Sequence, residues 1–296
     1  MLTFRYPENG RWYKGNTHVH STASDGGKTF AELAQLYRAA GCDFLFRTDH
    51  WVTSAAADDP AAYPLLWLDG VELDGRDSSG AAFHAVALGT LKGIQREMGL
   101  EAAMQSARAQ GALLILAHPQ WTGNSFDDAR RWQFDGVEVY NHVCRFLNGK
   151  GDGAAYWNAM LERSPRTLAL AADDLHLNPG DPGPGGGWVM VSAAECTPEA
   201  ILGALRAGQF YSSCGPVIET IACDGEFVRL TCSPVRYARL VGPAWHGMRC
   251  GSPDGGLIRA AEFRLPANWA YAYVELEDDQ GRRAWTNPLP LPEAAP

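Results

Sequence analysis

The feature that most constrains the fold of this chain is a repeated alternation of amphipathic helices with short apolar strands. Residues 29–41 (TFAELAQLYRAAG) carry apolar side chains at helical spacing, with Thr29 and Glu32 placed to form a capping box. The apolar run 43–48 (DFLFRT) follows at once and is typical of a buried strand. Further elements are predicted as a helix over 101–110 and strands over 112–117, 137–140 and 168–172. This alternation predicts parallel β/α units, arranged as a barrel or as a doubly wound sheet.

The pattern changes near Gly215. A last helix is predicted over 199–207, because Thr197 can serve as its N-cap and a proline stands in its first turn. Beyond Gly215 the helical period is lost. Short alternating runs separated by turn signals are found at 227–232, 237–241 and 271–276. We therefore predict two domains, an α/β domain over 1–215, built as a barrel or as a doubly wound sheet, and a small antiparallel β-sandwich over 216–296.

Charge and composition argue against several classes of protein. With 25 basic and 34 acidic residues the net charge is −9, which disfavours stable binding of duplex nucleic acid through a basic face. The seven cysteines are scattered and odd in number, so they indicate reduced thiols rather than a disulfide framework. The N-terminal residues lack the apolar core of a signal peptide, and no uncharged run approaches the roughly 20 residues that cross a bilayer. We expect a cytoplasmic protein without membrane association.

Histidines and carboxylates recur at one position relative to the predicted strands. Six of the eight histidines lie beside carboxylates where strands end or in the loops just after them, the edge where β/α folds place their active sites. His18 and His20 form an H-x-H pair whose side chains share one face of an extended segment, so both can reach one ion. The other members of the set are Asp25, Asp49, His50, Glu72, His84, His118, Asp173, Asp174 and His176. This pattern predicts a metal site.

Each of these residues also has a purely structural interpretation. A single histidine such as His84 is more often a hydrogen-bonded core or surface residue than a ligand. Asp49 and Asp173 can instead orient neighbours or cap a helix. His246, in the β-rich tail, is interpreted as structural. The repetition favours the metal site, because independent structural roles would not all fall on one edge.

Seven segments give the chain a resemblance to a known family, the PHP (polymerase and histidinol phosphatase) metal-dependent hydrolases. They are NTHVHSTASDG at 16–26, RTDHW at 47–51, GVEL at 70–73, FHAVALG at 83–89, LAHPQW at 116–121, GVEVYN at 136–141 and AADDLH at 171–176. They occur in the family's order and cover roughly residues 11–216. The tail, which begins with TPEAILGALRAGQFYSSCGP at 197–216, resembles the carbaryl-hydrolase-like (CehA/McbA) branch.

The resemblance implies a distorted (β/α)7 barrel that holds two to three divalent ions at its carboxyl edge, with zinc, manganese or iron as the candidates. The implied ligands are His18, His20, Glu72 and Asp174 for the first ion, Glu72 as a bridge with His84 and His118 for the second, and Asp25, His50 and His176 for the third. Many relatives have histidine where Asp25 stands, so the third set departs from the family's pattern.

Roles in the reaction are predicted for further residues. Glu72 and Asp174 would act in catalysis by holding the ions that activate a water. His142 is a candidate acid for the leaving group, with a supporting role behind the ligands as the alternative. Candidate substrate-binding cations are Arg47, Arg145 and Lys150. For Arg47 the alternative is a strand position whose side chain points to the other face of the sheet. For Arg145 and Lys150 the alternative is a solvated loop.

The leading functional hypothesis is a metal-dependent phosphoesterase that hydrolyses phosphate mono- or diesters, including nucleotide or oligonucleotide ends. Three divalent ions and the carboxylates of Asp25, Glu72 and Asp174 would leave a net charge of about +3, which suits a small anionic phosphorylated substrate. The alternative is a carboxyl ester, amide or carbamate hydrolase, since the same activated water can attack a carbonyl carbon. A non-catalytic binding protein is disfavoured because all nine predicted ligands are present. The roles left open for the β-rich tail are formation of a homodimer, covering of the site and binding of a carrier.

Overall fold

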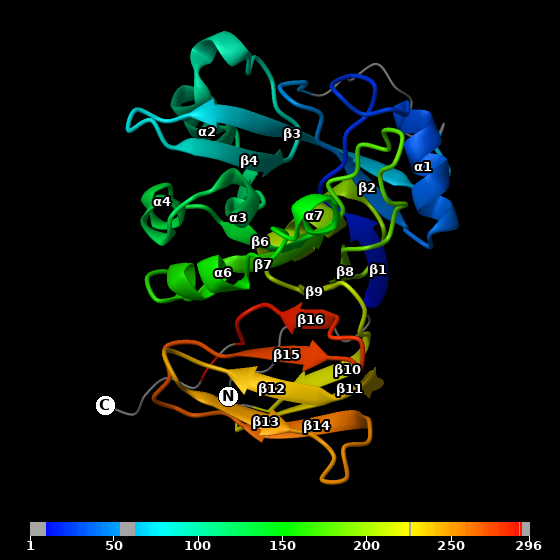
Figure 1. Cartoon of the computed structure of the whole chain (residues 1–296), viewed down its shortest axis with the longest axis vertical. Coiled ribbons are helices and arrows are strands. Elements are labelled where there is room, and N and C mark those ends of the chain that lie inside the picture. The colour runs from blue at the N-terminus through cyan, green and yellow to red at the C-terminus, as the bar shows by residue number, and fades with distance from the viewer. Residues whose placement is uncertain (1–9, 54–62, 225, 290, 292–296) are drawn as a thin grey trace.

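The computed structural model of the chain describes residues 10–53, 63–224, 226–289 and 291. Helices surround the strands of the first two thirds of the chain, and the C-terminal strands form the opposite end of the molecule (Figure 1). The helical elements are α1 (Phe30–Ala39), η2 (Arg96–Met98), α2 (Leu100–Ala109), α3 (Pro119–Thr122), α4 (Phe126–Arg131), α5 (His142–Asn148), α6 (Ala154–Leu161) and α7 (Pro198–Arg206).

One continuous sheet of thirteen strands runs through both ends of the molecule, and a second sheet has three strands. The N-terminal strands are β1 (Arg11–Asn16), β2 (Phe44–Arg47), β3 (Leu66–Arg76), β4 (Ala82–Leu88), β5 (Leu113–Leu116), β6 (Gly136–Asn141), β7 (Leu168–Ala172), β8 (Trp188–Ala193) and β9 (Phe210–Ser213). The C-terminal strands are β10 (Ile218–Cys223), β11 (Phe227–Val235), β12 (Tyr237–Val241), β13 (Gly247–Cys250), β14 (Ile258–Arg264), β15 (Tyr273–Glu277) and β16 (Arg283–Thr286). The large sheet has the order β13-β12-β15-β16-β9-β8-β1-β2-β3-β4-β5-β6-β7, and the small sheet has the order β10-β11-β14.

Strand direction follows the predicted parallel pattern in two groups of strands, whereas β4, β8 and β9 are antiparallel to their neighbours. Strands β1, β2 and β3 are parallel, as are β5, β6 and β7, whereas β4 is antiparallel to both β3 and β5. Only residues 77–81 join β3 to β4, and Asp77 closes this turn by accepting hydrogen bonds from the N–H groups of Ser79 and Ala81. A parallel crossover needs a dozen or more residues, so this short link enforces a hairpin.

The sheet curls until the carboxyl ends of β1 and β7 meet. Val19 and Leu175, which follow these two strands, form a parallel bridge. The Asp174 N–H donates to the carbonyl oxygen of His18 (2.9 Å), and the His20 N–H donates to that of Leu175 (3.0 Å). Segments more than 150 residues apart in sequence therefore lie side by side at the edge where the predicted ligands are found.

The helix predicted at 29–41 is confirmed as α1. Thr29 and Glu32 form the predicted reciprocal capping box, which satisfies two N–H groups that the first turn would otherwise leave without partners. Close packing in a separate apolar cluster, which contains Phe44 and not the residues of α1, requires a glycine on β1, because a Cβ atom on Gly15 would lie only 2.2 Å from the ring of Phe44. The predicted helices near 101–110 and 199–207 are likewise found, as α2 and α7.

The C-terminal strands enclose an apolar core of their own between the two sheets, including Val228, Leu240, Phe263 and Val274. This region is joined to the rest of the chain, because β16 pairs with β9 and the Tyr273 hydroxyl donates to Asn158 on α6. The predicted boundary at 215/216 and a separate sandwich stay predictions, since the large sheet continues across that boundary. No helix of the described residues is long and apolar enough to span a membrane.

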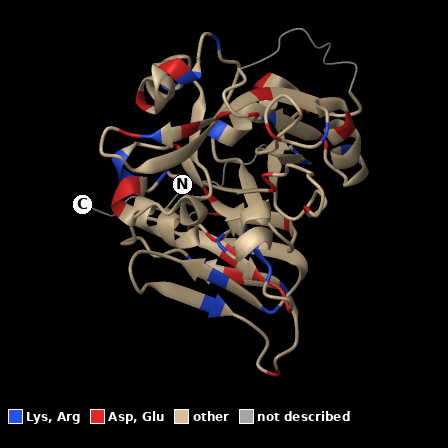
Figure 2. Cartoon of the chain, turned by 45° about the horizontal axis from the view of Figure 1, so that its top comes forward, with Lys and Arg blue, Asp and Glu red and all other residues tan. Residues whose placement is uncertain are grey.

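Charged side chains are distributed over many elements. In Figure 2 the Lys and Arg residues are scattered among Asp and Glu residues, and no single helix or sheet face is uniformly basic.

Candidate metal centre

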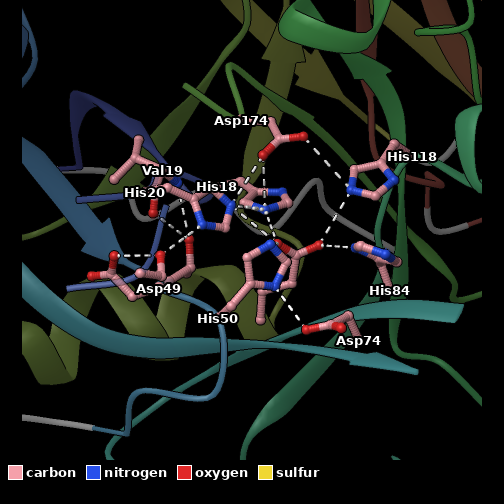
Figure 3. A network of polar contacts seen from close by, with 12 residues as sticks. His18, Val19, His20, Asp49, His50, Asp74, His84, His118 and Asp174 are labelled. Carbon is pink, nitrogen blue, oxygen red and sulfur yellow. Dashed lines mark hydrogen bonds and ion pairs between the residues drawn. The ribbon is translucent and has the colours of Figure 1, made fainter. Parts of the chain in front are cut away.

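All nine predicted ligands converge at the carboxyl edge of the curled sheet. His18 and His20 follow β1, His50 follows β2 and Glu72 lies within β3, while the remaining members come from later strands or from loops. Figure 3 shows the side chains of six of them pointing toward one another: His18, His20, His50, His84, His118 and Asp174. Their ligand atoms form three groups within 4.8 Å: His18, Glu72, His118 and Asp174; His20, Asp25, His50 and His176; and His50, Glu72 and His84.

The four residues predicted for a first ion lie close together. The Nε2 atoms of His18 and His20 lie 3.1 Å apart. Each lies 3.0 Å from Oε2 of Glu72 and 3.1 Å from Oδ1 of Asp174. Ligands about 2.0–2.1 Å from a tetrahedral zinc ion would lie ~3.3 Å from one another, so the four atoms are spaced almost as such an ion requires.

Glu72 connects two groups of imidazoles through its two oxygens. Oε2 faces His18 and His20, and it also lies 3.3 Å from Nε2 of His50. Oε1 lies 2.7 Å from Nδ1 of His84 and 3.2 Å from Nε2 of His118. This fully buried carboxylate is therefore oriented as a bridge between two ions would be.

Asp25 draws together the residues predicted for a third ion, at a more open position. Its Oδ2 atom lies 3.4 Å from Nε2 of His176 and 3.8 Å from Nε2 of His50, and its Oδ1 atom lies 3.4 Å from Nδ1 of His20. The Asp25 side chain is 54% exposed, whereas Glu72 and Asp174 are buried. This part of the cluster is thus the most accessible to solvent and to a ligand.

Two observations show that these donors fit a metal ion. Asp174 Oδ1 is buried and makes no hydrogen bond, although two imidazole nitrogens lie 3.1 Å away, so the neighbouring donors are aimed at a shared point rather than at one another. Imidazole and carboxylate donors without thiolate also suit divalent zinc, manganese or iron. His118 (φ 27°) and Asp174 (φ 55°) hold positive backbone angles, a strain of about 1–3 kcal/mol each that is typical of functional sites.

In the absence of ions the cluster attracts protons. Burial disfavours the charged form of His18, but Asp174, Glu72 and Glu138 outweigh this effect and hold the pKa of His18 well above its usual value. Burial likewise opposes protonation of His20, yet the adjacent carboxylates of Asp174 and Glu72 raise the pKa of His20 to about 9. Despite burial, contacts with His18 hold the pKa values of Glu72 and Asp174 below their usual range. A divalent ion must displace these protons, so metal binding weakens as pH falls.

Two carboxylates that the sequence analysis did not assign to the site support it from behind. Glu138 on β6 is buried, and its Oε1 atom lies 2.7 Å from Nδ1 of His18. Asp74 on β3 lies 2.9 Å from Nδ1 of His50 and is paired with Arg96. Carboxylates in this position fix the ring orientation of a metal-binding histidine. The available signal was the shared sequence Gly-Val-Glu, which places Glu72 in GVEL at 70–73 and Glu138 in GVEVYN at 136–141.

Replacing Glu138 with glutamine should weaken metal binding by about 10- to 100-fold, because the His18 ring would lose the anion that orients it and strengthens its basicity. Titration against a chromophoric chelator measures this change. Glu162→Gln, on the exposed rim of α6, is the matched control and should leave the affinity unchanged. Equal affinities in the two variants would show that Glu138 does not support the centre.

The adjacent residues Asp173 and Asp174 have different surroundings, because Asp173 binds a loop whereas Asp174 belongs to the cluster. Asp173 turns away from the cluster and accepts hydrogen bonds from the N–H groups of Gly185, Gly186 and Gly187 and from the Tyr37 hydroxyl. Asp49 is similarly occupied by Ser21 and Ser24. The structural alternatives considered for both aspartates thus match their contacts.

Asp173→Asn should therefore leave the metal content unchanged while lowering the free energy of unfolding by about 1–3 kcal/mol, since an amide cannot accept all four bonds. Asp174→Asn should have the opposite pattern, with metal lost and little change in the metal-free stability. Urea unfolding combined with elemental analysis separates the two. Loss of metal in Asp173→Asn would contradict this division.

The predicted substrate-binding cations are not brought to the cluster. Arg47 is buried on β2 and its guanidinium packs over the rings of Phe30 and Trp67, on the face that α1 covers. Arg145 and Lys150 are exposed on α5 and in the loop after it. None of the three lines the cavity described below. Strand alternation explains Arg47, because it shares its face with Leu45 in the core under α1.

His142 also lies outside the cavity lining. It begins α5, and its Nδ1 atom lies 3.2 Å from the Tyr140 hydroxyl. Its ring fills the space beside Gly186, where a Cβ atom would lie about 2.1 Å from it. Neither of these contacts is with a predicted ligand, so both roles considered for His142 stay predictions.

A cavity of about 280 Å³ opens over the cluster. Seven of the nine predicted ligands line it, and the other lining residues are Trp121, Val143, Cys144, Leu147, Asn178 and Asp181. Among the described residues that line it there is no Lys or Arg. The structure adds Asp181 in the lining and Glu138 behind it to the three carboxylates counted from sequence. Two or three divalent ions would then bring the site to within about one charge of neutrality, rather than to about +3.

Comparison with known proteins gives a structural likeness only. No protein-family model and no curated protein matches the chain. A two-domain protein from Bacteroides vulgatus, described as containing a predicted PHP-like metal-dependent phosphoesterase, matches with 16% identity and a TM-score of 0.52, over 99% of this chain and 96% of its own. The chain therefore shares the fold of that protein over nearly its whole length.

Two partial matches have lower scores. A candidate metal-dependent phosphoesterase from Bifidobacterium adolescentis has 15% identity and a TM-score of 0.43, over 57% of this chain and 89% of its own. An amidohydrolase from Chromobacterium violaceum, solved with sulfate and without metal, has 17% identity and a TM-score of 0.39, over 55% of this chain and 87% of its own.

Proposed function

We propose that this chain is a PHP-type metal-dependent hydrolase that cleaves phosphate esters. The observation that carries the proposal is the buried carboxylate of Glu72, which presents one oxygen to His18, His20 and His50 and the other to His84 and His118. Divalent ions held by these groups would supply an activated water as nucleophile and would stabilise the negative charge that develops on the substrate.

The chain's own residues make this chemistry possible by fixing the donors before substrate binds. His18 cannot rotate, because its two ring nitrogens contact Glu138 on one side and Glu72 on the other. His118 is held by Thr122, 3.1 Å from its Nδ1 atom. Donors that are already in position need not reorient during the reaction, whereas water molecules in their place would have to do so. In this proposal Glu72 and Asp174 keep their predicted roles, and His142 has the supporting one.

A second candidate function is hydrolysis of a carboxyl ester, amide or carbamate. The specific observation in its favour is the cavity wall, where the described residues supply Trp121 and Leu147 but no Lys or Arg to bind a highly charged group. A neutral carbonyl substrate could use the same activated water. The two functions differ in how inorganic phosphate should affect the enzyme.

Protein loaded with manganese or zinc should hydrolyse aryl phosphate esters, and inorganic phosphate should inhibit competitively, because its oxygens would occupy the place of the reacting group. Initial rates on matched 4-nitrophenyl phosphate esters, carboxyl esters and carbamates measure this preference. Glu72→Gln protein purified in the same way controls for contaminating phosphatases. Faster turnover of a carbamate or carboxyl ester than of any phosphate ester, without inhibition by phosphate, would replace the first function with the second.

A further inference from the structure

One wall of the cavity is apolar and partly uncovered. Trp121 on α3 is 39% exposed and packs edge-on against the rings of His84 (5.7 Å) and His118 (5.2 Å). Leu147 on α5 is 57% exposed, and Val143 lies on the same helix. All three line the cavity. A large apolar surface left open beside a group of candidate ligands is suited to the apolar part of a bound molecule.

The acidic residues in and behind the cavity lining limit how much negative charge such a molecule can carry. Asp181 lies in the cavity lining, and Glu138 lies behind His18. Together with Asp25, Glu72 and Asp174 they supply five negative charges, against four or six positive charges from two or three divalent ions. No described lining residue is a Lys or Arg that could bind a second phosphate group. A single negative charge on the substrate is therefore favoured over several.

The small size of the cavity also favours a substrate with a single phosphate group. Its volume of about 280 Å³ lies just below the roughly 300–1,000 Å³ typical of small-molecule sites. Bound ions would reduce the space further. This leaves room for one phosphate group and one ring-sized substituent.

From these observations we infer that the substrate is a phosphodiester monoanion with an aromatic substituent, whose ring lies against Trp121 and Leu147 while its phosphate faces Glu72 and Asp174. This inference rests on the proposed function and narrows its substrate class. It disfavours nucleoside polyphosphates and other multiply charged esters, which the predicted charge of about +3 would have suited.

Binding of two non-hydrolysable monoanions tests the inference apart from activity. Methyl(phenyl)phosphinate and dimethylphosphinate carry the same charge and differ only in the ring. Isothermal titration of metal-loaded protein should show that the phenyl compound binds at least ~10-fold more tightly, because the ring is buried against an aromatic and an aliphatic side chain. Trp121→Ala should abolish this preference, and Leu147→Ser should reduce it.

Matched controls are available on the same chain. Phe146 precedes Leu147 on α5 and is equally exposed at 56%, but it does not line the cavity, so Phe146→Ser should keep the preference. Trp245→Ala removes a tryptophan that is 88% exposed in the β12–β13 turn and should also keep it. Because Trp121 packs against two candidate ligands, the metal content of each variant is measured by elemental analysis. Leu147→Ser tests the wall without touching His84 or His118.

Two phosphate esters that share the same leaving group provide a further test. Methyl 4-nitrophenyl phosphate, a monoanion, should be turned over with a higher kcat/KM than 4-nitrophenyl phosphate, a dianion. Equal binding of the two phosphinates, or a preference unchanged in both Trp121→Ala and Leu147→Ser, would overturn the inference, as would a preference for the dianion. If no phosphate ester is hydrolysed, the proposed function fails, whereas the phosphinate preference still reports on the cavity wall.

Discussion

Replacing Glu72 with glutamine should lower kcat on phosphate esters by about 10³-fold or more while the protein stays folded. The amide keeps the size of the side chain but removes the charge that both groups of imidazoles face. Without that charge the site would hold its ions less tightly and farther from their productive arrangement. Steady-state kinetics, elemental analysis and thermal unfolding of the same preparation measure the three consequences.

Glu262→Gln provides the matched control for this change. It makes the same chemical replacement on β14, where Glu262 is exposed and paired with Arg229 in the small sheet. This variant should retain the activity and the metal content of the parent protein. Near-normal turnover by Glu72→Gln would mean that Glu72 does not hold the ions, and the proposed arrangement would have to be abandoned.

Removal of the ions should abolish hydrolysis and lower the melting temperature by roughly 8–16 °C. Ions that bind the folded chain at about 1,000 times their Kd would stabilise it by about 4 kcal/mol, and each kcal/mol corresponds to roughly 2–4 °C in a chain of this size. The buried carboxylates of Glu72 and Asp174 would lose a counter-charge, although protonated histidines compensate in part.

Differential scanning fluorimetry and activity assays before and after dialysis against a strong chelator measure both effects, and added manganese or zinc should reverse them. The shift should shrink as pH falls from 9 to 6, because His20, whose pKa is raised to about 9 without metal, becomes protonated and competes with the ions. Full activity in protein that contains less than about one tenth of an ion per chain would contradict the proposed chemistry.

The edge of the fold that carries the site could be predicted from the sequence, because its helix cap, strands and paired histidines depend on interactions between residues close together in the chain. The capping box of Thr29 and Glu32 is a contact between residues three apart, and the predicted strand at 168–172 is a short apolar run that is found with the same bounds as β7. The H-x-H pair of His18 and His20 likewise depends only on extended backbone. The structure brings all nine predicted ligands together at that edge.

What could not be predicted depends on long-range packing. The antiparallel direction of β4 follows from a hairpin whose turn, DSSG at 77–80, is held by Asp77, and the sequence analysis predicted neither of the strands that this turn joins. Arg47 lies two residues before Asp49 in sequence, but strand alternation and the Phe30 and Trp67 rings turn it toward α1. Glu138 was passed over because its partner, His18, lies 120 residues away.

The central claim is that the nine side chains around Glu72 hold divalent ions, and the metal content of the purified protein tests it most directly. After reconstitution with manganese or zinc and removal of free ions, elemental analysis should find two to three ions per chain. Glu72→Gln should hold fewer ions than the parent protein, and Glu262→Gln should hold the same number. Less than one ion per chain in the reconstituted parent protein would contradict the claim.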